Sequence, residues 1–109
     1  MRVIQKTGTI TTGLAVDNIW SGSAFEFLPG NAVVSMGLNC TAGTLGTINV
    51  GGTSVLEEST MAVGTDFPTI PDDMFYTFSG VQGDRLVTKL RNPTGGTITY
   101  FALAQIQEV

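Results

Sequence analysis

The sequence predicts an all-β domain, an antiparallel β-sandwich of about eight or nine short strands. No uninterrupted window has the i, i+3, i+4 apolar spacing of an amphipathic helix between capping residues. β-Branched residues recur in short stretches where apolar and polar side chains alternate, as in half-buried strands. The 14 glycines are spread along the chain and, with proline and asparagine, separate these stretches. The most economical version is a jelly-roll-like fold of two antiparallel sheets.

The N-terminal half supplies four of the expected strands, over residues 2–6, 9–16, 23–28 and 32–39. In the last three, apolar residues occupy alternate positions, such as Phe25 and Phe27 in the third strand and Val34 and Met36 in the fourth. Such alternation places these side chains on one face of a strand. The cluster Pro-Gly-Asn at 29–31 predicts a turn between the third and fourth strands.

The C-terminal half supplies five more, over residues 45–50, 53–57, 74–79, 85–91 and 97–107. Gly51 and Gly52 connect the first two, and this pair can supply the positive φ values of a tight hairpin. The last strand has apolar residues on alternate positions, and Phe101 and Leu103 add apolar side chains to its other face. We therefore expect the middle of this strand to be covered on both sides.

Length and composition restrict the class of protein. A chain of 109 residues predicts one domain, residues 1–109. Charged residues make up only 13% of it and the net charge is −4, which argues against nucleic-acid binding. A surface poor in charge suits contact with a partner, because fewer ions lose their water. The N-terminal segment MRVIQKTGTITTG lacks the apolar region of a signal peptide, and no apolar stretch is long enough to span a membrane. We therefore expect synthesis in the host cytoplasm and no membrane partner.

The residue types that carry most chemistry are missing. The chain has no histidine, the commonest general base and metal ligand, and Cys40 is its only cysteine. It has no phosphate-binding glycine motif and no zinc-ligand spacing. Asp66, Asp72 and Asp73 are oxygen donors of the kind calcium takes, but their spacing matches no calcium loop, and solvated loop acids are the simpler interpretation. We expect no enzymatic activity, no metal and no cofactor.

The segment GDRLVTKLRN, residues 83–92, contains three of the five basic residues: Arg85, Lys89 and Arg91. On a strand these three side chains point to the same side. The row has three interpretations: protection of an exposed edge strand, contact with nucleic acid, or a docking surface for an acidic partner or for the acidic part of another copy of the chain.

Two further features are candidate contacts. Residues 59–73 contain two prolines and no clean alternation, which predicts a crossover between sheets, a partner-contacting loop, or both. Its apolar contact residues would be Met61, Val63, Phe67 and Ile70. Trp20, beside an expected loop, is either a core residue or an exposed ring for a sugar or an interface.

The ending GDRLVTKLRNPTGGTITYFALAQIQEV consists of a Gly-Asp turn, a strand, an Asn-Pro-Thr-Gly-Gly hairpin and a long alternating strand. With a Thr- and Gly-rich composition, it resembles the small head-decoration, or cement, proteins of tailed bacteriophages. The resemblance is one of style over most of the chain, and it carries over no family site residue. It implies a non-enzymatic protein on the outer capsid surface of a virion, which forms a dimer or trimer and clamps the major capsid protein.

The function expected from the sequence is therefore capsid stabilisation by bridging neighbouring capsid subunits. The candidate partner-binding residues are Arg85, Lys89, Arg91, Met61, Phe67, Ile70 and Trp20. Two alternatives stay open: a carbohydrate- or receptor-binding module of a phage tail, which would use Trp20 and loop carboxylates, and a minor coat protein of a tail-less virus.

Overall fold

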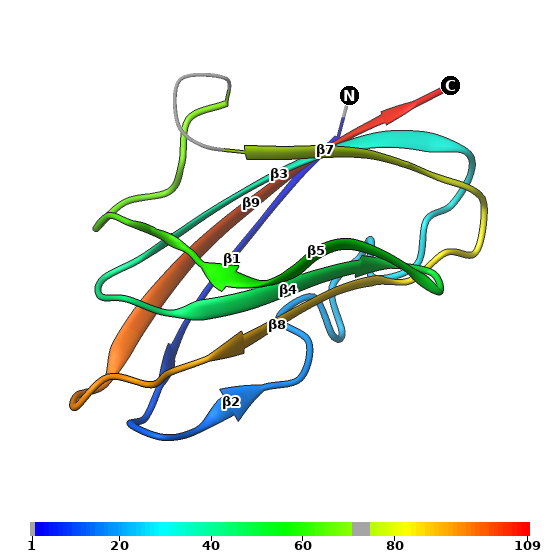
Figure 1. Cartoon of the computed structure of the whole chain (residues 1–109). Helices are drawn as coiled ribbons and strands as arrows, with labels where there is room; N and C mark the ends of the chain where they lie inside the picture. The colour runs from blue at the N-terminus through cyan, green and yellow to red at the C-terminus, as the bar shows by residue number, and fades with distance from the viewer. Residues whose placement is uncertain (1, 71–74) are drawn as a thin grey trace.

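The computed structural model describes residues 2–70 and 75–109. Within these ranges the chain forms nine β-strands and no helix. The strands form two sheets that pack face to face (Figure 1). The prediction of an all-β sandwich is confirmed. The described residues contain no helix long and apolar enough to cross a membrane.

Sheet A is the larger sheet. It contains β1 (Arg2–Ile10), β9 (Ile98–Glu108), β3 (Ala32–Cys40), β7 (Phe75–Gly80) and β6 (Ala62–Val63). Strand β9 lies between β1 and β3 and is antiparallel to both. The other edge of β3 pairs antiparallel with β7 along most of its length and parallel with the short β6 at its end.

Sheet B has the order β2 (Ala15–Val16), β8 (Leu86–Arg91), β4 (Leu45–Val50) and β5 (Thr53–Thr60), with antiparallel neighbours throughout. The core lies between the two sheets and is apolar. Its largest members with almost no exposed surface are Trp20, Leu28, Val34, Met36, Ile48, Leu86, Leu90, Ile98 and Ile106. Cys40 is also buried, and desolvation raises the pKa of its thiol.

The first two expected strands have different boundaries in the structure. Residues 2–10 form one continuous strand, because every residue from Arg2 to Ile10 pairs in register with β9. Gly8 belongs to this strand and lies against the ring of Tyr100, where a Cβ would come within 2.8 Å of the phenol oxygen. The chain then turns at Gly13, whose φ is 77°, so that only Ala15 and Val16 remain as β2.

The prediction of a strand over residues 23–28 is wrong. The segment folds instead into consecutive tight turns, in which the amides of Ser21, Ser23 and Glu26 bind carbonyl oxygens three residues earlier. Phe25 packs against the core, but Phe27 is 57% exposed and forms an isolated bridge with Arg85. The alternation of these two phenylalanines therefore does not describe one buried face.

The other expected strands are present with small shifts of their ends. The hairpin at Gly51 and Gly52 is confirmed, and Gly51 has the positive φ, 59°, that the turn requires. The expected strand 74–79 corresponds to β7, and its first residue, Met74, lies outside the described residues. Leu103 is only 7% exposed although it points away from the core, so the middle of β9 is covered on both sides as predicted.

Candidate partner-binding surfaces

The basic row lies on the outer face of sheet B. Leu86, Thr88 and Leu90 of β8 are buried, so the alternating Lys89 and Arg91 point outward. Arg85 precedes the strand and is also exposed. Strand β8 lies between β2 and β4 and is not an edge strand. The edge-protection interpretation of this row is therefore wrong.

Arg91 is paired with an acidic residue of the same sheet. Its guanidinium holds the Glu58 carboxylate at two points, with Nη2 to Oε1 at 2.7 Å and Nε to Oε2 at 3.2 Å. This pair spans β4, which separates β5 from β8. The hydrogen bonds from Arg91 lower the pKa of Glu58, and the charge of Lys89 lowers it further. Lys89 and Arg91 thus face an ionised carboxylate rather than open solvent alone.

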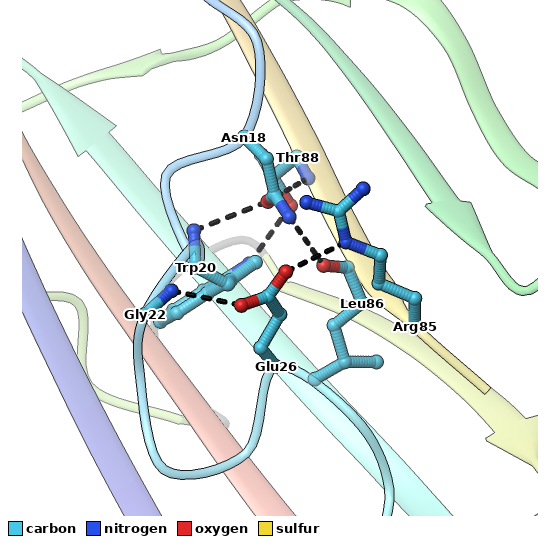
Figure 2. Close-up of polar contacts among 7 residues, drawn as sticks. All are labelled: Asn18, Trp20, Gly22, Glu26, Arg85, Leu86 and Thr88. Atoms are coloured by element: carbon cyan, nitrogen blue, oxygen red, sulfur yellow. Dashed lines mark hydrogen bonds and ion pairs between the residues drawn. The ribbon is translucent and has the colours of Figure 1, made fainter. Parts of the chain in front are cut away.

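Arg85 is paired in the same way with the loop before β3. Its Nε donates to Glu26 Oε2 at 2.7 Å, and the Gly22 amide donates to Glu26 Oε1 at 2.8 Å (Figure 2). The backbone hydrogen bond from Gly22 and then the one from Arg85 lower the pKa of Glu26. The guanidinium also lies 5.9 Å from the ring centre of Phe27. Two of the three basic candidates are therefore engaged within the molecule.

Trp20 belongs to the same loop, and its side chain is buried. Its side chain has 0% exposed surface, and its indole N–H donates to Thr88 Oγ1 at 3.0 Å. The Thr88 hydroxyl in turn donates to the Met36 sulfur at 3.2 Å. Asn18 ties the loop to β8, because its Oδ1 accepts the amides of Trp20 and Thr88 and its amide group donates to the Leu86 carbonyl (Figure 2). The indole offers no face to a sugar ring or to a partner.

Met61 is a core residue as well. It is 2% exposed, and its sulfur comes close to Gly46, where a Cβ would lie at 2.8 Å from it. Its amide donates to the Thr44 carbonyl at 2.8 Å. The expectation that Met61 contacts a partner is not compatible with this placement. Among the described apolar residues of the segment, Val63 is the most exposed, at 68%.

The next part of the segment packs on the outer face of sheet A. The ring of Phe67 meets Phe101 of β9 edge to face, with centroids 5.5 Å apart. Asn39 of β3 donates to the Asp66 carbonyl at 2.9 Å. Ile70 is half-buried. Residues 59–70 therefore connect the two sheets, and Phe67 contacts the chain's own sheet.

No metal-ligating cluster of three or more His, Cys, Asp or Glu side chains occurs among residues 2–70 and 75–109. Of the three carboxylates considered for calcium, Asp66 is exposed and lies in the segment of residues 59–70 that connects the two sheets, whereas Asp72 and Asp73 lie outside the described residues. No pocket is found within the same two ranges.

The outer face of sheet A contains no charged side chain in its four main strands. The register of β1, β9, β3 and β7 places their outward residues side by side. These residues, which we call the uncharged face, are Val3, Gln5, Thr7, Thr9, Val33, Ser35, Gly37, Asn39, Phe75, Thr77, Ser79, Thr99, Phe101, Leu103, Gln105 and Gln107. At one end Phe67 and Asp66 cover it. The rest has exposed side chains, including Gln5, Thr77 and Gln107.

Sequence reasoning missed this face because it searched for charged and aromatic residues. The sequence nevertheless contains the pattern that indicates this face. In two of the predicted strands the alternate positions from Val33 to Asn39 and from Thr99 to Gln107 are all uncharged. It also missed several exposed apolar residues, among them Phe27 and Val81, each 57% exposed.

Comparison of the chain with protein-family models, with curated proteins and with solved structures found no match.

Proposed function

We propose that the protein is a structural component of a virion that decorates and stabilises the capsid. It binds the major capsid protein on the outer capsid surface and bridges neighbouring subunits as a small oligomer. The observation that carries this proposal is the uncharged face, a broad sheet surface built from four strands without one ionised side chain.

The distribution of charge favours this face over the basic row. Docking through sheet B would desolvate or separate the ion pairs Arg85–Glu26 and Arg91–Glu58. Burying ionised groups is unfavourable unless a partner replaces every interaction with water. Away from the end that Phe67 and Asp66 cover, docking through the uncharged face removes water only from neutral groups. Its glutamine, serine and threonine side chains can hydrogen-bond a partner. Many weak contacts of this kind gain strength from repetition over a capsid.

We also propose that the sandwich is a jelly roll. In support, the order β1-β9-β3-β7 faces the order β2-β8-β4-β5. Strands β1 to β4 alternate between the two sheets, as do β7 to β9. Double-sheet jelly rolls built from two Greek keys are common in viral capsid proteins and also in lectins.

The test is co-sedimentation with capsids that lack the decoration protein, using variants that add a charge to sheet A or remove one from sheet B. Gln105→Lys and Gln105→Glu each introduce one charge near the middle of the uncharged face, on the half-buried position of the central strand β9. Lys89→Gln removes a charge from the outer face of sheet B. We expect saturable binding of the natural protein, weaker binding of both Gln105 variants, and unchanged binding of Lys89→Gln.

The two opposite charges at position 105 separate the possible causes. If desolvation of the face governs binding, both signs weaken it. If only one sign weakens binding, long-range charge attraction governs it and the neutral-face argument fails. Loss of binding with Lys89→Gln but not with the Gln105 variants would move the contact to the basic row. A protein that ignores capsids altogether refutes the decoration function.

A further inference from the structure

Strand β1 is the longest regular edge strand within residues 2–70 and 75–109. All nine of its residues pair in register with β9, and β1 lies at the end of the strand order of sheet A. By contrast, β2 is two residues long and β5 has two register shifts against β4. The outer edge of β1 therefore has backbone N–H and C=O groups at alternate residues that can pair with an added strand.

The inner side of this edge carries two cations. Arg2 and Lys6 pair with fully buried residues of β9, so their side chains lie on the side of β1 that faces sheet B. Ile4 lies between them and packs against the core. Arg2 forms one exposed ion pair, with Glu108 at 3.5 Å, whereas Lys6 forms none within the described residues.

These two cations oppose pairing with an arbitrary strand. A neutral or basic strand laid beside them removes water from the cations and offers no counter-ion, which is why inward-pointing charges protect an edge. An acidic strand does offer one, because a residue directly opposite on a paired strand lies on the same face with its Cβ about 5 Å away. The edge therefore discriminates against most strands and favours one with carboxylates at the matching positions.

We propose that β1 binds an extended acidic segment of another protein, which adds antiparallel to this edge of sheet A as a further strand. Because Arg2 and Lys6 are four positions apart, the segment has two carboxylates at the same spacing. An apolar residue midway between them lies opposite Ile4, and the intervening residues, beside Val3 and Gln5 of the uncharged face, are uncharged. The segment thus has the pattern acid-x-apolar-x-acid, where x is an uncharged residue.

A second copy of this chain does not supply such a segment. Strand β1 itself contains no acidic residue, so a copy of β1 has no counter-ion for Arg2 or Lys6. The nine acidic residues of the whole chain include no two that are four positions apart. The occupant is therefore a different polypeptide. This inference goes beyond the proposed function, and its test needs neither a capsid nor an oligomer.

The experiment is a titration of the isotope-labelled protein with short peptides whose termini are blocked, followed by the NMR shifts of the backbone amides. The probe Thr-Glu-Thr-Val-Thr-Glu-Thr has the proposed pattern. We expect saturable shifts at the amides of β1 with a Kd between about 0.1 and 1 mM, because a peptide of this length buries little surface.

Two control peptides test the charge and its spacing on the natural protein. Thr-Gln-Thr-Val-Thr-Gln-Thr keeps the shape without the charge and should bind at least about fivefold more weakly. Thr-Glu-Glu-Thr-Val-Thr-Thr has the same composition as the probe, but its adjacent glutamates point to opposite faces of a strand. It should also bind more weakly than the probe.

Two variants of the protein test the place of binding. Lys6→Glu reverses one charge of the edge, and Lys89→Glu makes the same change on the outer face of sheet B. The Kd of the probe should rise by about fivefold or more in Lys6→Glu and stay within about twofold in Lys89→Glu. Thermal unfolding of both variants, expected to agree closely with the natural protein, shows that lost binding is not a lost fold.

Several outcomes overturn the proposal. The absence of saturable shifts up to about 5 mM probe shows that the edge does not bind the segment at the expected affinity. Equal affinity for the acidic and the neutral peptide shows an edge without charge selection. Shifts centred on another strand, or weaker binding in Lys89→Glu alone, place the peptide elsewhere. If Lys6→Glu fails to fold, the three peptides still decide the matter on the natural protein. Capsid binding by a protein that ignores the probe would refute this inference and leave the proposed function standing.

Discussion

The hydroxyl of Thr88 offers a direct test of how the loop over residues 17–28 is held to β8. Thr88 has no exposed surface, and its Oγ1 is the acceptor for the indole N–H of Trp20 at 3.0 Å. Thr88→Val keeps the shape and the β-branched side chain but removes the acceptor. The indole N–H is then buried without a hydrogen-bond partner. The weak hydrogen bond from Thr88 to the Met36 sulfur is lost as well.

The magnitude follows from these contacts. Leaving a buried donor unpaired costs about 1–3 kcal/mol, so Thr88→Val should lower the free energy of unfolding by that amount. Thr88→Ser keeps the hydroxyl and loses one buried methyl group, which costs about 1 kcal/mol. The valine variant should therefore be at least as destabilised as the serine variant, although valine is the more apolar of the two. In a Trp20→Phe background the donor is gone, and Thr88→Val should cost about 1 kcal/mol less than in the natural chain.

Urea unfolding followed by circular dichroism measures the natural protein and all four variants, because Trp20 is the only tryptophan and its fluorescence is lost with Trp20→Phe. The difference between valine and serine should appear as a shift of the midpoint with an unchanged slope. A valine variant as stable as the natural protein would refute the argument, because the buried N–H would then have no need of this acceptor. So would equal costs of Thr88→Val in the two backgrounds.

Three further predictions concern the acidic partner of β8, a close approach in β1 and the segment of residues 59–70 that connects the two sheets. The pKa of Glu58 in the folded protein lies below its ordinary value of 4.5, so its ion pair stabilises the fold above that pH and is lost as the pH falls through the lowered pKa. The variant Glu58→Gln lacks this pair and should therefore lose less stability than the natural protein when the pH is lowered from about 6 to 3. Chemical unfolding at each pH measures the difference. Gly8→Ala should destabilise by about 1–3 kcal/mol, because the added methyl meets the Tyr100 ring, whereas Gly43→Ala, which meets nothing within 4 Å, should leave the melting temperature nearly unchanged. Phe67→Ala should speed proteolytic cleavage within residues 61–70, because it removes the edge-to-face contact with β9; unchanged cleavage would show that this contact does not hold the segment.

The sequence was most informative where local chemistry and burial agree. Gly51 and Gly52 lie between two alternating stretches, and the structure forms the hairpin there. Residues 23–28 show the opposite case. Their alternation is as regular as that of a strand, but Glu26 binds the amide of Gly22 within its own loop and reaches Arg85. These polar contacts, together with tight turns, replace the ladder that a strand would have formed.

The candidate site was predictable only in part for a similar reason. The period of two in β8 placed Lys89 and Arg91 on one face, which the structure confirms. Whether those cations are paired depends on residues far away in the sequence, since Glu58 and Arg91 are separated by 33 positions and brought together across β4. The place of β8 within its sheet also depends on residues far away in the sequence. Nothing within residues 85–91 indicates that the strand has neighbours on both sides, because sheet order is set by the whole chain.

The pairing of these ions bears on which side of the molecule a partner would use. Arg85 and Arg91 are paired with Glu26 and Glu58, which lie in the loop beside sheet B and in the sheet itself. This face therefore has little net positive charge with which to attract an acidic surface. Exposed pairs of this kind contribute little to folding stability, yet they resist burial because both ions would lose water. The uncharged face has the opposite balance, with neither long-range attraction nor an ionic desolvation penalty. Binding through it should therefore depend weakly on salt, whereas binding through the basic row should weaken steadily as salt rises. A salt titration of capsid binding by the natural protein separates the two faces without any substitution.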